Sequence, residues 1–567
     1  MLVRDEIAAA VAEALRTAQR MGELPAFELP PPLPPIEVTR TKDPAHGDYM
    51  TSVAMQLARA APFRGVAPLA IAQAIAKRLP ASGLIGSAEA APPGFLNLRL
   101  SATWLAGQVA AIEAAGQAYG AIDLGQGRAC QVEFISVNPT GPIHIGSARN
   151  AVIGDTLAHI MSAAGYRVQR EYYVNDAGTQ MRNFGETLHR RYLQQMGRDA
   201  PLEDNHYQGA YMVDLAREVV AEQGARFLDM PAEEAISQLQ EIGLERMLAG
   251  IRKSVAKLHI AFDRWYSERS LYEPGGTFEH VMADLRQAGV TETRDGAEWL
   301  RTSAFGSDRD EVLIRSTGQP GYYASDVAYH YDKFVMRGFD RVIDVWGVDH
   351  QNQARRMPHL MKALGLDPDR LTIVLYDLVR LYRDGREVKL SKRSGDIITL
   401  DEVVEEVGSD AVRFLLLTRS NNSVMDFNLN LAVQQNDENP VYYVQYAHAR
   451  MASILRTADE RGFPPSRFAD GDLSLLGHPA ELALLRKMAE LPEVIERAAA
   501  QLAPHHLAFY ASDLGGTFHA FYRDCRVISS AADEVELSCV RLRLVAATKR
   551  VFAQVLGLMG VNAPETM

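Results

Sequence analysis

The spacing of apolar residues predicts alternating strands and helices in the middle of the chain. Residues 129–137 (ACQVEFISV) have the composition of a buried strand. A Pro/Gly turn follows at 138–142, an Ala-rich helical pattern begins near Gly146 and extends to about Ala164, and a second strand pattern covers residues 166–174. Strand, turn, helix and strand in this order form a βαβ unit, so we expect a Rossmann-like, doubly wound parallel sheet of the α/β class.

The patterns on either side of this unit predict further domains. A small α+β domain is expected over residues 1–118. Its pattern consists of an Ala-rich helix over residues 1–20, a polyproline-type connector at 29–35 (LPPPLPP) and a turn with an alternating strand at 92–100. The α/β domain is expected over 119–400, with a charged helical insertion at about 185–257 and strand patterns at 311–315, 341–346 and 371–377. From residue 401 the pattern is helical, which predicts a connecting segment over 401–435 and an all-α domain over 436–567.

Composition narrows the classes of protein. The chain has 567 residues, 47% of them hydrophobic, and no apolar run long enough to span a membrane. Residues 1–20 lack the basic start and continuous apolar stretch of a signal peptide. The three cysteines form no CxxC pair, so we expect neither a disulfide framework nor a zinc site, and we predict a cytoplasmic protein with no metal ligands of its own.

The net charge of −12 by itself disfavours a nucleic-acid partner, but net charge is only an average over the surface. Residues 380–393 carry six basic side chains and only two acidic ones. This stretch could be a solvated loop or a local anion-binding surface, and composition leaves both interpretations open.

Two short motifs carry candidate chemistry. Residues 142–147 (PIHIGS) lie between the first predicted strand and its helix, where orphan N–H groups favour phosphate, Gly146 permits close approach and His144 adds a donor. Residues 388–395 (VKLSKRSG) place Lys389 and Lys392 in a loop next to a glycine, where their ammonium groups could close over a polyphosphate. For either motif alone the favoured interpretation is the ordinary one, a turn that contains a histidine for the first and a solvated basic loop for the second.

Taken together and in this order, the two motifs resemble the HIGH and KMSKS signatures of class I aminoacyl-tRNA synthetases. Leu390 in place of Met conserves side-chain volume. Ser147 stands where the family pattern has its second histidine, and serine can donate a hydrogen bond but cannot carry a positive charge. The resemblance assigns catalysis to His144, Gly146, Lys389 and Lys392, and ATP binding to these four with Pro142, Ser147 and Ser391.

Longer runs are similar to arginyl-tRNA synthetases in particular, and they extend over most of the chain. They are residues 132–142 (VEFISVNPTGP), 322–330 (YYASDVAYH), 344–350 (DVWGVDH) and 436–450 (NDENPVYYVQYAHAR). Residues 46–49 (HGDY) and 93–97 (PGFLN) resemble the extra N-terminal domain of this family, which touches the tRNA elbow. The resemblance implies ATP and Mg²⁺ as cofactors, L-arginine and tRNA(Arg) as partners, and a monomer.

Arginine presents a planar, permanently charged fork of donors that a carboxylate can grip with two hydrogen bonds. Asp326 is the candidate carboxylate, and Tyr322 can meet it if this segment is helical. The alternative for Asp326 is an acid that stabilises a helix N-terminus. By resemblance, Glu133, Ser136 and Asn138 hold the α-amino and carboxylate end of arginine.

Two further groups of residues complete the predicted site. Gly347, Asp349 and His350 follow a predicted strand, where a nucleotide ribose would lie in a doubly wound sheet, although a simple strand-to-helix turn has the same pattern. Asn439 and Pro440 have the pattern of a helix cap and first position. In that helix the resemblance implies tRNA binding, with Tyr443, Tyr446 and Arg450 as candidates, while a core position is the alternative for the tyrosines.

The implied reaction is attack of the arginine carboxylate on the α-phosphorus of ATP, then transfer to the terminal 2′-hydroxyl of tRNA, which must bind before arginine is activated efficiently. Three rival interpretations are a synthetase for another amino acid, a small-metabolite nucleotidylyltransferase and a non-catalytic paralogue. The missing cysteine ligands disfavour the cysteinyl enzyme, the C-terminal helices disfavour the nucleotidylyltransferase, and the intact lysines disfavour the paralogue.

Overall fold

The computed structural model describes residues 2–25, 36–81, 83–388 and 398–567. At its centre lies a parallel sheet in the order β12-β11-β5-β6-β7. The strands are β5 (Ala129–Glu133), β6 (Arg167–Val174), β7 (Arg264–Ser267), β11 (Arg341–Gly347) and β12 (Leu371–Tyr376). From β5 the chain progresses outward in one direction to β6 and β7, and β11 and β12 extend the sheet in the other. The predicted doubly wound sheet is confirmed, with its switch point between β5 and β11.

The two faces of the sheet are covered by different helices. Helix α5 (Ile145–Ala163) follows β5 and packs against β5, β6 and β11. On the other face, α9 (Thr277–Gln287), α10 (Ala324–Tyr331) and α12 (Met357–Ala363) share an apolar core with Tyr173 and Tyr266 from β6 and β7. A π-helical turn, η6 (Asp332–Met336), continues α10 directly.

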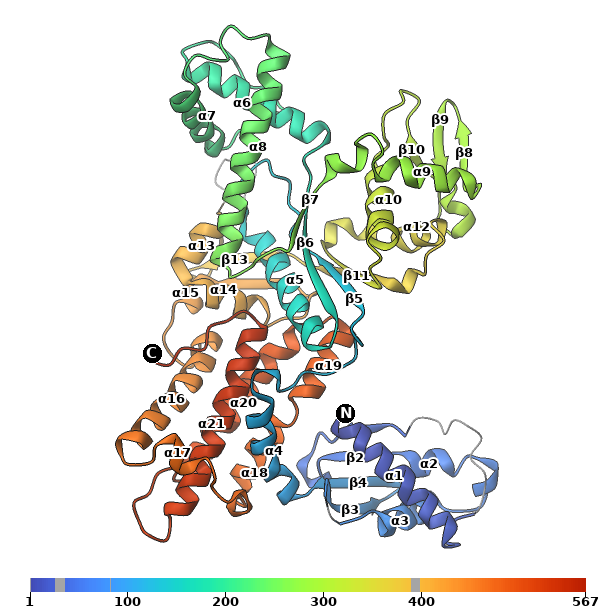
Figure 1. The fold of residues 1–567 in the computed structure, drawn as a ribbon, viewed down its shortest axis with the longest axis vertical. Coiled ribbons are helices and arrows are strands. Elements are labelled where there is room, and N and C mark those ends of the chain that lie inside the picture. Colours follow the sequence, from blue (N-terminus) through green and yellow to red (C-terminus); the bar gives the residue numbers. More distant parts are fainter. Residues whose placement is uncertain (1, 26–35, 82, 389–397) are drawn as a thin grey trace.

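Two insertions extend from this sheet (Figure 1). Between β6 and β7, helices α6 (Gly178–Gln195), α7 (Ala210–Gln223) and α8 (Ala232–Lys257) enclose a core of their own, and they begin seven residues before the predicted insertion. The second contains the antiparallel strands β8 (Thr291–Arg294), β9 (Ala297–Leu300) and β10 (Glu311–Ile314). The strand pattern at 311–315 therefore belongs to this small sheet. Asp295 and Gly296, both at positive φ, make the β8–β9 turn.

The N-terminal unit is an antiparallel sheet with three helices. Its strands are β1 (Val38–Arg40), β2 (Tyr49–Thr51), β3 (Ile85–Ala91) and β4 (Phe95–Leu100), and its helices are α1 (Val3–Arg20), α2 (Val53–Leu57) and α3 (Pro68–Arg78). The predicted polyproline connector, residues 29–35, lies outside the described residues. Helix α4 (Ala102–Ala115) leaves this unit and packs against α18 and α21 of the C-terminal helices (Figure 1).

After the central sheet the chain is mostly helical, but not entirely. Strands β13 (Val379–Arg383) and β14 (Arg386–Val388) form a hairpin around Asp384 and Gly385, and β15 (Met425–Asn428) pairs in parallel with β13. The connecting segment predicted over 401–435 was expected to be helical, and it also contains the strand β15. The helices after β12 are α13 (Leu400–Val407), α14 (Ser409–Leu416), α15 (Leu429–Ala432), α16 (Pro440–Glu460), α17 (Pro465–Phe468), α18 (Pro479–Met488), α19 (Leu491–Gln501), α20 (His505–Asp524) and α21 (Val535–Leu558), whereas the short helix α11 (Gln351–Ala354) lies between β11 and β12.

Charged and aromatic side chains join the N-terminal sheet to the C-terminal helices. Tyr49, which is fully buried, donates to Glu493 Oε1 over 2.7 Å, and Arg40 Nε donates to the other oxygen of the same carboxylate over 2.7 Å. Asp48 pairs with Arg486 at 2.7 Å. Two residues of the HGDY motif therefore face the C-terminal helices. None of the described helices is long and apolar enough to cross a membrane.

Candidate functional site

The turn after β5 carries three of the predicted site residues. The strand ends at Glu133, four residues before its predicted end, because Ile135 (φ 68°) and Ser136 (φ 43°) adopt left-handed backbone conformations. This conformation is unfavourable for a β-branched residue, and it is held by a hydrogen bond from Ile135 N to Asn150 Oδ1 of 2.7 Å. The turn directs residues 134–144 across the carboxyl ends of β5 and β11, where a doubly wound sheet binds ligands.

His144 occupies the N-cap of α5, as the motif predicts. A Cβ on Gly146 would come within 2.9 Å of His144 Nδ1, so only glycine leaves the imidazole in its observed place. Ser147 is almost fully buried and its Oγ lies 3.5 Å from His144 Nε2. The serine that departs from the HIGH pattern therefore contacts the histidine of the same motif. Pro142, one turn earlier, is exposed at the edge of the site.

Lys389, Ser391 and Lys392 lie outside the described residues. The described chain that follows them is anchored at the start of α5. β14 ends at Val388, and after the gap Thr399 forms an antiparallel β-bridge with His144, while Leu400 N donates to Ile143 O over 2.8 Å. Thr399 also caps α13 in a capping box with Glu402. The backbone that follows the predicted lysine loop is therefore tied to the predicted phosphate site.

Asp326 lies in the first turn of α10, so it also fits the alternative of a helix-start acid. Its half-buried carboxylate accepts a hydrogen bond of 2.7 Å from Gln353 Nε2, a neutral amide. Burial raises the pKa of Asp326 above its ordinary value. A partly desolvated carboxylate whose charged form is disfavoured gains from binding a cation. Tyr322 precedes the helix, and its side chain is 76% exposed.

A second carboxylate, Glu268, lies beside Asp326 and was missed by the sequence analysis. Ser325 Oγ donates to Glu268 Oε1 over 2.7 Å, and Tyr272 shares a hydrogen bond of 2.8 Å with the same serine. Burial raises the pKa of Glu268, and the neighbouring negative charges of Asp176 and Asp326 raise it further. Two desolvated carboxylates side by side make a pocket that favours a cation.

The residues predicted to hold the other end of arginine have different surroundings. Asn138 is exposed and donates to Gln180 Oε1 of α6 over 2.6 Å. Ser136 Oγ accepts from Tyr173 N over 3.1 Å and donates to Glu133 Oε1 over 3.0 Å. Glu133 is buried, and its second oxygen accepts from Lys333 Nζ. Asn138 is thus accessible to a ligand, whereas both oxygens of Glu133 are engaged by protein groups.

Gly347 is the last residue of β11, and Asp349 and His350 follow it at the switch point. The side chains of Asp349 and His350 are 81% and 51% exposed, with His350 Nε2 3.7 Å from Asp349 Oδ2. A Cβ on Gly347 would lie 2.4 Å from Asp349 Oδ1, so any larger residue here would displace this exposed carboxylate. His350 Nδ1 is 3.3 Å from Gln353 Oε1. Through Gln353, the predicted ribose-binding turn is connected to Asp326.

Helix α5 also contains two site-forming residues that the sequence analysis did not single out. Arg149 is fully buried and donates to the carbonyl oxygens of Asp377, Ser420 and Ser423 over 2.7–2.9 Å. Asn150 Nδ2 donates to Val345 O over 2.8 Å. Arg149 thus fixes α5 against the loops near the carboxyl ends of the strands, and Asn150 fixes it against β11. The signal in the sequence is a polar pair within an Ala-rich helix.

The predicted tRNA-binding residues form one cluster on α16. Asn439 Oδ1 accepts from Val441 N over 3.3 Å, which confirms the predicted cap. Arg450 donates to Tyr446 Oη over 2.6 Å and lies 4.6 Å from the centre of the Tyr522 ring of α20. Tyr443 and Tyr446 are half-buried, so each ring combines core packing with an accessible edge.

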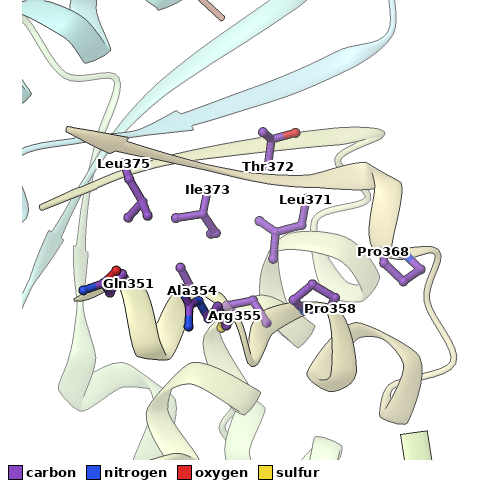
Figure 2. A pocket seen from close by; sticks show the side chains of 10 residues that line it. Gln351, Ala354, Arg355, Pro358, Pro368, Leu371, Thr372, Ile373 and Leu375 are labelled. Carbon is purple, nitrogen blue, oxygen red and sulfur yellow. The ribbon is translucent and has the colours of Figure 1, made fainter. Parts of the chain in front are cut away.

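The described residues also contain a cavity of about 350 Å³ between α11, α12 and β12. Figure 2 shows side chains of Leu371, Ile373 and Leu375 from β12 facing those of Ala354 and Pro358. None of the predicted site residues lines it. Within the described ranges, no group of three His, Cys, Asp or Glu side chains could hold a metal ion.

Comparison with known proteins covers the whole chain. Three family models match in succession: arginyl tRNA synthetase N terminal domain over residues 3–100, tRNA synthetases class I (R) catalytic domain over 108–453, and DALR anticodon binding domain over 444–567. The arginine–tRNA ligase of Dehalococcoides mccartyi is 46% identical over 567 residues, and that of Heliobacterium modesticaldum is 44% identical over 569, each covering 100% of this chain and 99% of the relative. The Thermus thermophilus arginyl-tRNA synthetase structure covers 100% of both chains, with a TM-score of 0.76 and 26% identity.

Proposed function

Because the chain belongs to the class I arginine–tRNA ligase family, we propose that ATP and arginine bind side by side at the carboxyl ends of β5 and β11. The reaction converts ATP, L-arginine and tRNA(Arg) to arginyl-tRNA(Arg), AMP and diphosphate through an arginyl-adenylate. The observation that carries the residue assignment is the carboxylate pair Asp326 and Glu268, which is held by neutral partners and connected through Gln353 to the turn after β11.

The first step is in-line attack by the arginine carboxylate on the α-phosphorus of ATP, with diphosphate as the leaving group. It requires no side-chain nucleophile, so the protein contributes positioning and charge stabilisation. His144 and the N–H groups at the start of α5 are proposed to stabilise the α-phosphate, and Lys389, Ser391 and Lys392 the leaving diphosphate. The β-bridge between Thr399 and His144 supports this, because it tethers the end of the lysine loop to the same place.

Gly347, Asp349 and His350 are proposed to contact the ribose of ATP, since they lie at the end of β11, at the switch point. Pro142, Gly146 and Ser147 complete the phosphate side. Mg²⁺ is proposed to arrive with the phosphates of ATP, because the described residues offer no metal-binding group and Mg²⁺ commonly uses substrate phosphates as ligands.

Selectivity for arginine is proposed to come from Asp326, with Glu268 as a second acceptor and Tyr322 as a ring over the entrance. A guanidinium fork satisfies two carboxylates with parallel hydrogen bonds, whereas an ammonium leaves acceptor sites unpaired in a desolvated pocket. Asn138 and Ser136 are proposed to hold the α-amino and carboxylate end. Glu133 is proposed to hold the turn that carries Ser136 and Asn138 in place, since its oxygens already accept hydrogen bonds from Lys333 and Ser136.

In the second step, the terminal 2′-hydroxyl of tRNA attacks the adenylate carbonyl and AMP leaves. Tyr443, Tyr446 and Arg450 are proposed to contact anticodon-side nucleotides, which the accessible ring edges and the guanidinium of this cluster support. We assign residues 1–118 to tRNA elbow contact, 119–400 to catalysis, 401–435 to connection and 436–567 to anticodon binding. As the family resemblance implies, tRNA binds before arginine is activated.

The enzyme is further proposed to work as a monomer in the cytoplasm, where its three buried free cysteines would stay reduced. Charging of a total tRNA pool with each of twenty labelled amino acids tests the substrate assignment. Arginine alone should be transferred, and lysine should be rejected by several powers of ten. Transfer of another amino acid at a comparable rate would refute it. Pyrophosphate exchange with arginine at full rate without tRNA would refute the proposed order of binding.

A further inference from the structure

Three acidic residues lie side by side across the central strands. In the parallel register, Asp344 of β11 is paired with Glu133 of β5, and Glu133 is paired with Glu171 of β6. Their exposed fractions are 0%, 7% and 0%. Like charges at neighbouring positions of a sheet repel, and buried charges are costly unless they are paired. This acid row therefore requires positive partners inside the protein.

The segment formed by α10, η6 and Arg337 directly after η6 supplies two positive partners and one neutral donor. Lys333 Nζ donates to Glu133 Oε2 over 2.6 Å and to Asp344 Oδ1 over 2.8 Å, and its side chain is completely buried. Arg337 and Tyr329 both donate to Glu171. Burial lowers the pKa of Lys333, but the charges of Asp344 and Glu133 outweigh it, so the pKa is raised and the ammonium stays charged.

Each of the two carboxylates that bind Lys333 also contacts a residue beside the proposed arginine site. Glu133 accepts from Ser136, whose left-handed backbone leads to Asn138. Asp344 Oδ2 lies 3.0 Å from His330 Nε2, and His330 Nδ1 donates to the backbone carbonyl of Asp326 over 2.8 Å. The Lys333 ammonium is thus connected by hydrogen bonds to both parts of the proposed arginine site. Glu133 and Ser136 lead to the turn with Asn138, and Asp344 and His330 lead to Asp326.

We propose that Lys333 is a positioning residue for arginine, which sets the distance between Asp326 and the turn bearing Asn138 by holding Asp344 and Glu133 together. Its complete burial keeps it from touching the substrate, so it acts only through these carboxylates. The inference rests on the proposed arginine site. A purely structural role would instead lower stability and the fraction of active enzyme, while each active site kept its affinity for arginine.

The test uses the full-length enzyme with saturating tRNA, active-site titration and thermal unfolding. Lys333→Met removes the charge but keeps much of the side-chain volume. Phe334→Leu is the matched control, because Phe334 is the next residue, is 4% exposed, and packs in a separate apolar cluster with Phe339, Val342 and Met361. Per active site, Lys333→Met should raise the KM for arginine at least tenfold and the KM for ATP less than threefold. Phe334→Leu should change both KM values less than threefold.

A second variant keeps the proposal testable if Lys333→Met does not fold. Lys333→Met/Glu133→Gln removes one charge of each sign and leaves an amide oxygen that can accept from Ser136. The double variant should fold. Its KM for arginine should be at least threefold higher than that of the wild type, and lower than that of Lys333→Met if the single variant folds. A wild-type arginine KM in the folded single or double variant, or an equal rise in Phe334→Leu, would overturn the inference.

Asp326→Asn measured in parallel separates the two levels of the proposal. If Asp326→Asn raises the arginine KM and Lys333→Met leaves it unchanged, the arginine site stands and only the role of Lys333 is lost. If Asp326→Asn also leaves it unchanged, the arginine site itself is wrong.

Discussion

Asp326→Asn removes one negative charge from the proposed guanidinium pocket and preserves the shape of the side chain. The amide oxygen of Asn can still accept the hydrogen bond from Gln353, which is 2.7 Å long in the native protein, so α10 should fold normally. Breaking a buried ion pair by removing one partner costs about 3–5 kcal/mol. Since about 1.4 kcal/mol corresponds to tenfold in affinity, the KM for arginine should rise by about two to four powers of ten. Glu268 remains as an acceptor, which favours the lower end of this range.

The assay is tRNA charging at saturating ATP and tRNA, over a range of arginine concentrations. Asp369→Asn is the matched control, because it makes the same substitution at an exposed position. The control should leave the KM for arginine unchanged, and thermal unfolding of both variants should stay close to wild type. An unchanged arginine KM in folded Asp326→Asn would remove Asp326 from its proposed role.

Three further predictions concern the rest of the molecule. Lys392→Ala should slow adenylate formation in rapid-quench measurements by roughly 10²-fold or more with little change in arginine affinity, because the lost charge acts on the leaving diphosphate; the reverse outcome would refute this division of roles. The kcat/KM for arginine should fall as the pH is lowered, and the fall should begin above the ordinary pKa range of carboxyl groups. The reason is that burial raises the pKa of Asp326 and of Glu268, and a protonated carboxyl group cannot pair with a guanidinium. A profile that stays flat down to pH ~4 would contradict this. Tyr49→Phe should lower the free energy of unfolding by about 1.5–3 kcal/mol, since it removes a buried hydrogen bond to the charged Glu493, as denaturant titration would measure; no loss would contradict the interface.

The sequence predicted those parts of the fold that depend on local pattern. The βαβ unit, a helix that opens near Gly146 and the cap of α16 at Asn439 follow from period, Gly/Pro turns and capping residues. The end of β5 was placed four residues too late, because residues 134–137 are apolar enough for a strand, and only the tertiary bond from Asn150 explains the left-handed turn.

Features that depend on distant contacts were missed. Glu268 and Gln353 reach Asp326 from segments far apart in the chain, and no local pattern distinguishes them from solvated polar residues. Lys333 has the pattern of an ordinary charged helix position, and its buried role follows only from the register of β5 and β11. Asp48 and Tyr49 were expected in a tRNA-contacting domain, yet their side chains are engaged with Arg486 and Glu493.

A crystal structure of the enzyme with arginine, a non-hydrolysable ATP analogue and tRNA tests the central claim most directly. The guanidinium group should lie within hydrogen-bond distance of Asp326 and Glu268, with the α-phosphate next to His144 at the start of α5. A guanidinium bound elsewhere, or a nucleotide far from His144, would contradict the assignment of this site.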